Sequence, residues 1–344
     1  MSEIKKICIL SDWMHGLPDE GIHNLAQSLL DQWKTAYSVR ALKIGADFSV
    51  NRLFFSRSLR AALREISPDL IVYISSSSAK VAALFRARML KIYSPRSRVF
   101  VVATQPVHHG RVGRRLAVLL APDGIFVQSP ESMEELRHIP CPVHFLPSGV
   151  DTSRFVPVDD ARKKDLRRKH GVDEGAFVVL HVGHINRGRN VQIFETVARV
   201  GDIQVMLVGS TSTPHDEDLA RQLKQAGVRL IREYVPHIEE IYQLADAYIF
   251  PVVSEDAAIG VPLSVLEAMA CNLPVVTTPF GGLPGIFPKG NGFVYFNGEN
   301  DLPASIDAVR RLQQSSTRGM VEPYDWKNVA SGAIEMIQSR KSSR

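Results

Sequence analysis

Residues 262–276, PLSVLEAMACNLPVV, have the pattern of a buried helix followed by a buried strand. This stretch gives the clearest indication of the fold. One residue departs from the pattern. Glu267 has only small or apolar neighbours three and four positions away, so a solvent-facing stripe does not explain it. Burying an unpaired carboxylate costs roughly several kcal/mol. We therefore expect Glu267 to have a specific hydrogen-bonding partner.

The same alternation of short β-branched runs and longer helical segments extends outward through the whole chain. In the second half we expect strands at 177–185, 203–210, 228–235, 247–253, 274–280 and 292–296. In the first half we expect strands at 5–12, 38–45, 69–75, 98–104, 124–129 and 143–149. The intervening helices include 21–34, 56–66, 191–200, 217–227, 238–245 and 325–340. Such alternation is typical of parallel sheets covered by helices on both faces, the α/β class.

Four segments follow from this pattern. Residues 1–150 form one doubly wound domain and 176–320 a second, joined by a polar connection at 151–175 that begins a charged helix. The terminal segment, 321–344, carries a last helix that could return to the first domain. Ligands bind outside the carboxyl ends of strands in open sheets, so we expect the site in a cleft faced by both sheets.

Composition bounds the class of protein. The chain has 344 residues, 45% hydrophobic and 22% charged, which is typical of a soluble globular protein. Its three cysteines are far apart in apolar settings and predict neither a disulfide framework nor a metal site. No apolar run approaches the roughly 20 residues that cross a bilayer. We expect a cytoplasmic protein without a signal peptide, with the inner membrane face as a peripheral location to consider.

Charge is unevenly distributed. The net charge is +5, but residues 1–150 hold 19 Lys and Arg against 12 Asp and Glu. Within that half, residues 80–122 contain nine basic residues and no acidic one. A solvated basic face and a surface for an anionic membrane or acceptor fit this stretch equally well. Nucleic acid is less favoured, because no recognition motif or aromatic interleaving accompanies the charge.

Three loops carry residues suited to binding an anion or a diol. After the first strand, Gly16 and Gly21 flank a helix start, although G-x-G-x-x-G is absent and an ordinary loop is the better reading. After the strand at 177–185 come Gly183, His184 and Arg189, where an imidazole and a guanidinium beside a helix start suit a diphosphate.

The third loop opens the helix that carries Glu267. Gly260, Val261, Pro262 and Leu263 lead into a helix start, whose N–H groups lack intrahelical acceptors. A carboxylate within that helix can accept two hydrogen bonds from a vicinal diol such as ribose. After the next strand, the pair Gly281–Gly282 brings backbone near the same place.

These stretches carry a resemblance. The segments at 146–157, 178–190, 242–251 and 262–282, in this order and spacing, resemble the retaining nucleotide-sugar glycosyltransferases of glycosyltransferase family 4. The likeness covers nearly all of the second domain; in the first it rests on strand pattern and on 121–136, APDGIFVQSPESMEEL. It implies the GT-B fold, two doubly wound Rossmann-like domains facing a cleft.

The resemblance also implies roles for individual residues. Glu267 matches the glutamate that binds the donor ribose, and His184 and Arg189 stand where the family places Arg and Lys against the donor diphosphate. The amides of Gly260–Leu263 match the loop that cradles the β-phosphate and sugar. Gly16 matches the acceptor-side glycine loop. Catalysis in such enzymes is mainly stabilisation of the departing diphosphate and of an oxocarbenium-like sugar. The resemblance therefore implies no metal and no cofactor beyond the nucleotide-sugar donor.

Several positions depart from the family pattern. Ile259 stands where a sugar-binding glutamate is usual, with Glu255 and Asp256 just upstream. His184 replaces Arg, which makes the diphosphate site dependent on protonation near neutral pH. A first-domain T-x-H run is replaced by Thr-Gln-Pro at 104–106, and His108 or His109 could substitute or be exposed loop residues. Gly285 replaces a frequent glutamate.

The sequence thus predicts a retaining hexosyltransferase that moves a sugar from a nucleoside-diphosphate donor to a glycolipid, lipid-linked or polysaccharide acceptor. Its candidate catalytic residues are His184, Arg189 and His108. The alternative is a nucleotide-sugar-binding regulatory or scaffolding protein that has lost transfer, and Ile259 and His184 keep that alternative open.

Overall fold

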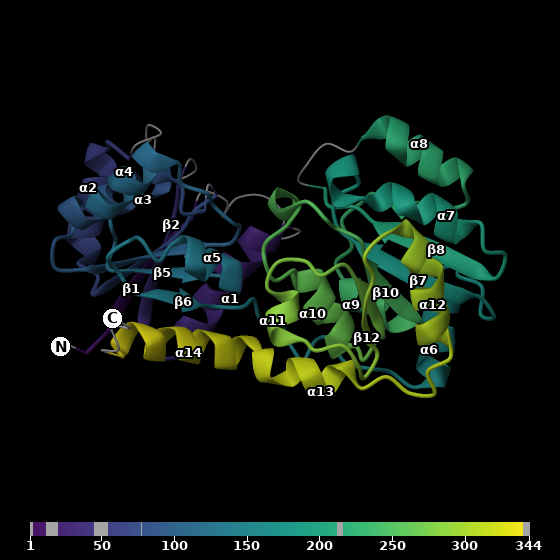
Figure 1. The fold of residues 1–344 in the computed structure, drawn as a ribbon. Helices are drawn as coiled ribbons and strands as arrows, with labels where there is room; N and C mark the ends of the chain where they lie inside the picture. The colour runs from purple at the N-terminus through teal and green to yellow at the C-terminus, as the bar shows by residue number, and fades with distance from the viewer. Residues whose placement is uncertain (1–2, 12–19, 45–53, 77, 212–215, 340–344) are drawn as a thin grey trace. The chain divides into compact units, whose positions relative to one another are not determined.

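The computed structural model describes residues 3–11, 20–44, 54–76, 78–211 and 216–339. Its contacts divide the chain into two compact units (Figure 1). The first unit comprises residues 1–148, 259–261 and 326–344. The second comprises residues 149–258 and 262–325. Each unit has a parallel sheet of its own.

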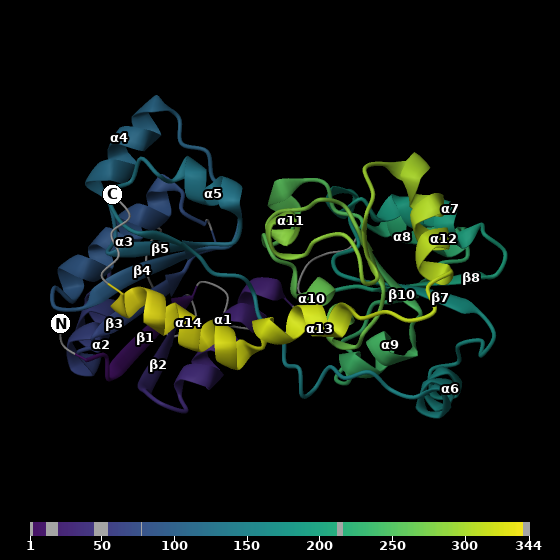
Figure 2. The same ribbon diagram turned by 60° about the horizontal axis from the view of Figure 1, so that its bottom comes forward.

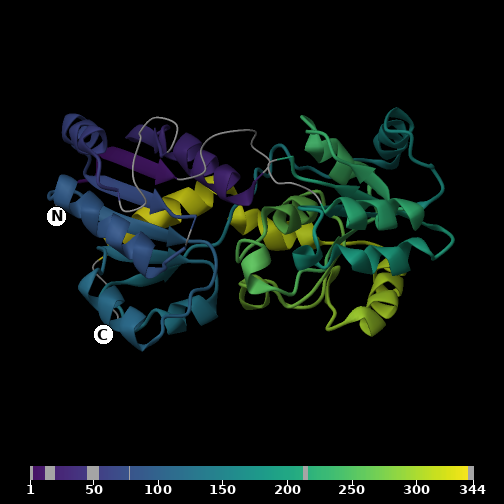
Figure 3. The same cartoon turned by 90° about the horizontal axis from the view of Figure 1, so that it is seen from above.

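The sheet of the first unit has six strands in the order β2-β1-β3-β4-β5-β6, all paired in parallel. The strands are β1 (Lys6–Ser11), β2 (Ser38–Lys43), β3 (Leu70–Ile74), β4 (Arg98–Ala103), β5 (Gly124–Val127) and β6 (Val143–Phe145). The helices are α1 (Gly21–Trp33), α2 (Arg57–Ile66), α3 (Val81–Tyr93), α4 (Arg111–Leu119), α5 (Pro130–Glu135) and α14 (Trp326–Gln338). Apart from Arg98 at the start of β4, the central strands β3 and β4 are apolar, because both faces of the sheet are covered by helices (Figure 3).

The C-terminal helix α14 belongs to the first unit, although most of the second unit lies between it and residue 148 in the sequence. It packs against α1, where the indole Nε1 of Trp33 donates to the carbonyl of Ala330 at 2.9 Å. Arg98 on β4 donates to the carbonyl of Ile337 near the helix end. Lone carbonyls in the last turn have no intrahelical donor, so the arginine satisfies one of them.

The sheet of the second unit also has six parallel strands, in the order β12-β11-β10-β7-β8-β9. The strands are β7 (Phe177–Val182), β8 (Ile203–Val208), β9 (Arg229–Ile231), β10 (Ala247–Phe250), β11 (Val275–Thr277) and β12 (Phe293–Tyr295). The α-helices are α6 (Asp160–Lys169), α7 (Phe194–Ala198), α8 (Glu217–Gln225), α9 (Ile238–Leu244), α10 (Leu263–Ala270), α11 (Leu283–Ile286), α12 (Leu302–Arg310) and α13 (Thr317–Val321). Short 3₁₀ turns are η1 (Arg187–Arg189), η2 (Val191–Ile193), η3 (Glu255–Ala257), η4 (Glu299–Asp301) and η5 (Glu322–Tyr324).

Both parallel sheets predicted from the sequence are confirmed, and every observed strand lies within an expected range. The helix expected at 191–200 is wrong in form. It begins as the 3₁₀ turn η2 and becomes α-helical only at Phe194. Asn190 adopts a left-handed conformation with φ of 57°, which breaks the helical path before it, and the β-branched Val191 and Ile193 are weak helix formers.

The strand order places a switch point in the second sheet. From β7 the chain winds through β8 and β9 in one direction, and then returns to the other side of β7 to continue through β10, β11 and β12. At such a point two neighbouring strands send their following loops to opposite faces, which opens a crevice at their carboxyl ends. The loop after β7 and the segment between β10 and α10 therefore flank the natural binding place of this unit.

Candidate functional site

The loop after β7 is held in a fixed shape by its own asparagines. The side-chain oxygen of Asn186 accepts from the backbone N–H of Arg189 at 3.0 Å and caps η1. The side-chain amide of Asn190 donates to the carbonyl of Pro251 at 3.1 Å, just beyond the end of β10. His184 and Arg189, both partly buried, thus sit on a loop anchored to the two strands of the switch point.

Beneath this loop lies a buried histidine that the sequence analysis did not single out. His181 on β7 is fully buried, and its Nδ1 contacts the carbonyl of Ile249 at 2.9 Å, so Nδ1 carries the proton. Among the described residues, its Nε2 has no hydrogen-bond partner. Burial lowers the pKa of His181 to about 4, and the positive charges of Arg189 and His184 act in the same direction. The ring is therefore neutral at physiological pH.

Gly183 follows directly, and its lack of a side chain matters. A Cβ at this position would lie 3.1 Å from Nε2 of His181 and 3.7 Å from Nη1 of Arg189. The glycine thus lets the strand end approach both the imidazole and the guanidinium closely.

Glu267 lies in the middle of α10 and has a partner within the chain. The hydroxyl of Tyr242 on α9, itself fully buried, donates to its Oε2 at 2.7 Å. Burial raises the pKa of Glu267, opposed by the Tyr242 hydrogen bond and by the charge of Arg154, while Glu239 adds to the rise. The residue is partly exposed, so the carboxylate is held on one side by Tyr242 and remains open on another. A carboxylate has acceptor capacity for such a second set of donors.

An aromatic layer connects Glu267 to the β7 loop. The ring of Tyr242 lies 5.9 Å from that of Tyr248 on β10, which stacks on His181 at 6.2 Å. The hydroxyl of Tyr248 donates to Oγ of Ser264, in the first turn of α10, at 2.7 Å. The charges of Glu267 and Arg189 both act on the Tyr248 phenol, whose pKa is raised chiefly by burial. The carboxylate and the guanidinium are therefore both close enough to the Tyr248 ring to act on its phenol.

The start of α10 is organised differently from the expectation. The N–H of Gly260 donates to the carbonyl of Thr104 at 2.7 Å, and that of Val261 to Oε1 of Gln128 at 3.3 Å, all within the first unit. A Cβ on Gly260 would lie 2.9 Å from Cβ of Gln128, so this close approach requires glycine. These two amides already have acceptors. Pro262, the N-cap, has no N–H, and its carbonyl accepts from the amides of Val265 and Leu266. A phosphate cradle there would rest on the amides of Leu263 and Ser264.

Ile259 is buried in the first unit. A Cβ built on Gly21, the first residue of α1, would lie 3.1 Å from Cδ1 of Ile259, so the isoleucine packs directly over this glycine. Glu255 and Asp256, the acidic residues just upstream, lie exposed in η3. The position where the family pattern calls for a sugar-binding carboxylate thus holds an apolar contact.

The remaining candidates of the first unit are Gly16 and the histidines at 108 and 109. Gly16 falls outside the described residues. His108 is 80% exposed, with Nδ1 4.0 Å from Oε2 of Glu135. His109 is buried, contacting the carbonyl of Ala79 at 3.0 Å and Nε2 of His138 at 3.3 Å, and burial lowers its pKa. Of the adjacent pair, His108 is the one accessible to a ligand.

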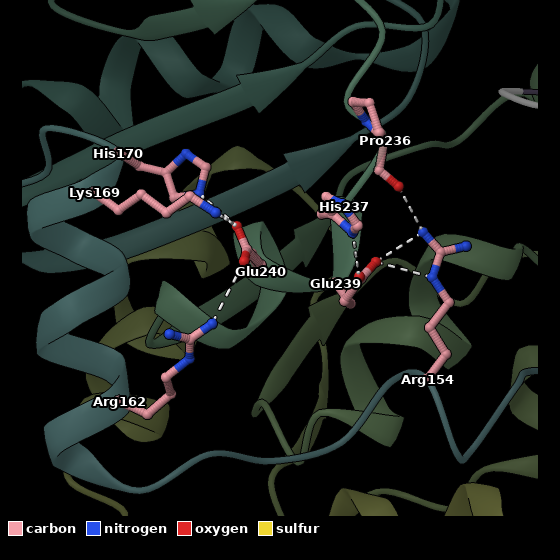
Figure 4. Close-up of polar contacts among 8 residues, drawn as sticks. All are labelled: Arg154, Arg162, Lys169, His170, Pro236, His237, Glu239 and Glu240. Atoms are coloured by element: carbon pink, nitrogen blue, oxygen red, sulfur yellow. Dashed lines mark hydrogen bonds and ion pairs between the residues drawn. The ribbon is translucent and has the colours of Figure 1, made fainter.

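A network of ion pairs that the sequence analysis missed fixes the helix that carries Tyr242 (Figure 4). Arg154 donates through Nε to Glu239 at 2.9 Å and through Nη2 to the carbonyl of Pro236 at 3.1 Å. Glu240 receives contacts from three residues of or beside α6, namely Arg162, Lys169 and His170. Both carboxylates stand in the first turn of α9, where the helix dipole favours negative charge. These contacts hold α9 in place, and α9 in turn aims Tyr242 at Glu267.

Neither a set of metal ligands nor a membrane-spanning helix is present among residues 3–11, 20–44, 54–76, 78–211 and 216–339. No group of three or more His, Cys, Asp or Glu there is arranged to hold a metal ion. Within the same residues, no helix is long and apolar enough to cross a membrane.

A comparison with protein families identifies the second unit. Residues 176–315, which include β7, α10 and Glu267, match the family model described as "Glycosyl transferases group 1". The matched part of the chain, which holds most of the second unit, belongs to this family. Group 1 corresponds to glycosyltransferase family 4, so the family expected from the sequence is confirmed.

Individual relatives agree with this assignment. Over 256 residues the chain is 28% identical to the alpha-maltose-1-phosphate synthase of Mycolicibacterium smegmatis, covering 65% of each protein. It is 32% identical over 212 residues to the D-inositol 3-phosphate glycosyltransferase of Geodermatophilus obscurus, covering 55% of this chain and 45% of that one. The match to each therefore spans less than two thirds of the relative's length.

The fold is shared along almost the whole chain. The crystal structure of Anabaena HepE in complex with UDP-glucose superposes with a TM-score of 0.76 at 16% identity, covering 96% of this chain and 99% of that one. At that identity the likeness shows the fold alone. The chain thus has the GT-B fold, as expected.

Proposed function

We propose that this group 1 protein is a retaining glycosyltransferase that transfers a hexosyl group from a nucleoside-diphosphate sugar to a lipid-linked or polysaccharide acceptor. One observation carries the proposal. At the switch point of the second sheet, the charges of the partly exposed carboxylate of Glu267 on α10 and of the Arg189 guanidinium on the β7 loop both act on the buried Tyr248. A nucleoside diphosphate presents a vicinal diol, which a carboxylate can accept from, and an anion, which a guanidinium can bind.

In this proposal each group has one task. Glu267, aimed by Tyr242, accepts from the two ribose hydroxyls. Arg189 and His184 bind the diphosphate, together with the amides of Leu263 and Ser264 at the start of α10. The bond between the sugar C1 and the phosphate oxygen breaks, the acceptor oxygen bonds to C1 on the same face, and the acceptor's proton passes to the departing diphosphate. Stabilising that departing charge is the main catalytic term, and His184 and Arg189 supply it.

His108 is the first-unit residue that we assign to the acceptor side, because it is the exposed member of the histidine pair at 108–109. Gly16 and Gly21 belong to the acceptor-side loop in the same proposal. No metal ion or further cofactor takes part, since the cationic side chains carry the diphosphate. The relatives named above are a synthase and a glycosyltransferase, and the Anabaena protein is described with UDP-glucose, so UDP-sugars are the first donors to test.

The proposal predicts that Glu267→Gln weakens nucleotide binding without destabilising the fold. Two charge-assisted hydrogen bonds to the ribose become neutral ones, a loss of about ten- to a hundredfold in affinity. The amide oxygen still accepts from Tyr242, and the desolvation that raises the pKa of Glu267 disappears, so the melting temperature should hold or rise. Calorimetric titration with UDP, GDP and ADP measures affinity, and thermal unfolding measures stability.

Glu335→Gln is the matched control, because Glu335 is an exposed glutamate on α14 of the first unit. It should leave both measurements at wild-type values. Unchanged nucleotide affinity in Glu267→Gln would remove the ribose role. A drop equal to that of the control would remove it as well.

The alternative, a nucleotide-sugar-binding protein without transfer, draws on the buried Ile259 at the usual carboxylate position. A panel of UDP-, GDP- and ADP-sugars with a crude glycolipid extract separates the two functions. Transfer of labelled sugar to the extract supports the enzyme. Tight nucleotide binding with no turnover of any donor would favour the binding protein instead.

A further inference from the structure

Helix α4 in the first unit has the opposite of the usual amphipathic arrangement, because its large apolar residues are exposed to solvent and its small residues face the core. The residues facing the body of the unit are small: Ala117 is fully buried, and a Cβ on Gly113 would lie 3.6 Å from His109. The large apolar residues face outward. Val112 is 72% exposed, Leu116 41% and Leu119 74%, and their spacing of four and three places them along one side of the helix.

The rest of the outer surface of α4 is basic. Arg111, Arg114 and Arg115 are all exposed. Among the described residues, these arginines form one ion pair, a contact of 3.4 Å between Nη2 of Arg114 and Oε1 of Glu135 on α5. The surrounding stretch, residues 80–122, has nine basic residues and no acidic one. Figure 2 shows α4 at the margin of its unit, beside α3 and beyond the strands.

Exposed apolar residues flanked by arginines define the chemistry of the occupant. A helix of this composition is typical of those that lie in the interface of a bilayer, with apolar side chains at the acyl boundary and cations among the lipid phosphates. A second copy of the chain fits poorly, because a two-fold contact through α4 would bring the same arginines against one another. An anionic lipid surface complements both the charge and the apolar side.

We propose that α4 docks the first unit on an anionic membrane, with Val112, Leu116 and Leu119 inserted at the acyl boundary and the three arginines paired with lipid phosphates. This docking does not depend on the proposed transfer reaction. It would place the first unit beside lipid-borne molecules, and the other basic residues of 80–122 would add long-range attraction that salt screens.

The test is flotation of the full chain with vesicles of phosphatidylcholine, alone or mixed with phosphatidylglycerol. Wild-type protein should float with the anionic vesicles, remain in solution with the neutral ones, and be released by salt. Each basic residue near such a surface contributes about fivefold to binding, so Arg111→Gln/Arg114→Gln/Arg115→Gln should lose roughly a hundredfold. Val112→Ser/Leu116→Ser/Leu119→Ser should lose binding at low salt as well, because insertion is removed.

Matched controls come from exposed residues of the second unit. Arg199→Gln/Arg221→Gln/Arg311→Gln removes the same charge, and Val200→Ser/Leu312→Ser removes exposed apolar groups. Both should float like wild type, and all variants should keep its melting temperature. Equal flotation of the α4 variants and the controls would overturn the proposal. So would a dimer, seen by light scattering, that the α4 serine variant dissolves.

Nucleotide titration keeps this proposal separate from the transfer reaction. The α4 variants should bind UDP as wild type does, because α4 belongs to the first unit and the proposed donor residues Glu267 and Arg189 to the second. A chain that floats with the vesicles but binds no nucleotide would contradict the proposed function and support membrane docking. A chain that binds nucleotide but never floats would do the reverse.

Discussion

Helices α4 and α10 each contain residues on the wrong side for an ordinary helix of a soluble protein, and they do so in opposite ways. In α4 the leucines and a valine face solvent and the small residues face the core. In α10 the apolar residues Val265, Leu266, Ala268 and Met269 are buried as expected, and a carboxylate lies among them. Each arrangement is unfavourable in free energy, because it exposes apolar side chains to water or buries a carboxylate.

The two inversions differ in what compensates them. Glu267 has an internal hydrogen-bond donor, Tyr242, on a helix that Arg154 holds in place through Glu239. The outward residues of α4 have no comparable buried contact, since Val112 and Leu119 are about three-quarters exposed. An internal partner indicates a side chain poised for a small ligand. Exposed apolar area without one indicates an extended surface as the partner.

The sharpest way to break this comparison is to remove a leucine from each helix. Leu266 is fully buried, so Leu266→Ala should lower the free energy of unfolding by about 2–5 kcal/mol. Leu119 contributes little to the core, so Leu119→Ala should change it by no more than about 0.5 kcal/mol. Urea unfolding followed by circular dichroism measures both.

Leu302→Ala, another buried leucine of the second unit, checks that Leu266 behaves as an ordinary core residue. Destabilisation by Leu119→Ala as large as that by Leu266→Ala would mean that α4 packs against the unit through its large residues. The reading of α4 as an outward surface would then be lost.

A second test compares the protonation of a buried histidine, His181, with that of an exposed one, His108. His181 must stay neutral beneath the β7 loop, and its pKa, lowered to about 4, lies below the ordinary value of 6.5. A lowered folded-state pKa means that the unfolded chain binds the extra proton first. Stability is therefore full above pH 6.5 and falls by about 3 kcal/mol as pH drops toward 4.

His181→Asn should remove this acid sensitivity while keeping the contact to Ile249, because the amide nitrogen takes the place of Nδ1. Calorimetric melting temperatures of wild type and variant, followed from neutral pH to pH 4, give the difference. His108→Asn is the control, since His108 is exposed and should leave the acid profile unchanged. Parallel profiles for wild type and His181→Asn would contradict a neutral buried ring.

Sequence reasoning reached the fold and part of the site, for a physical reason. Strands such as β3, LIVYI, are buried on both faces, so a run of five consecutive apolar or aromatic residues is enough to predict them. The same local logic found Glu267, because its helical neighbours are all apolar or small. It missed Tyr242 and His181, since each resembles an ordinary core aromatic until its partner is known.

The helix start at 260–263 illustrates a further limit. Its amides looked available because a helix N-terminus leaves N–H groups without intrahelical acceptors. The acceptors for Gly260 and Val261 are Thr104 and Gln128, more than a hundred residues earlier. A pairing across that distance depends on tertiary packing, and no local pattern encodes it. The exposure of α4 is of the same kind, because its amphipathic pattern does not say which side faces the core.

The smallest expected effect tests whether Tyr242 aims the α10 carboxylate. Tyr242→Phe removes one donor from Glu267, which should reduce nucleotide affinity about fivefold. Because that hydrogen bond lowers the pKa of Glu267, its loss lets the carboxylate protonate more readily. The deficit should therefore be larger at mildly acidic pH and shrink as pH rises. Titration with UDP across this range measures it.

Tyr248→Phe supplies the comparison for that measurement, since it also deletes one buried hydroxyl from the aromatic layer. The Tyr248 hydroxyl contacts Ser264 and the carbonyl of Val182 but not Glu267. Its effect on affinity should therefore lack the pH dependence seen in Tyr242→Phe. If both variants lose affinity equally at every pH, the aromatic layer acts only as packing, and the carboxylate of α10 would need no internal donor to bind its ligand.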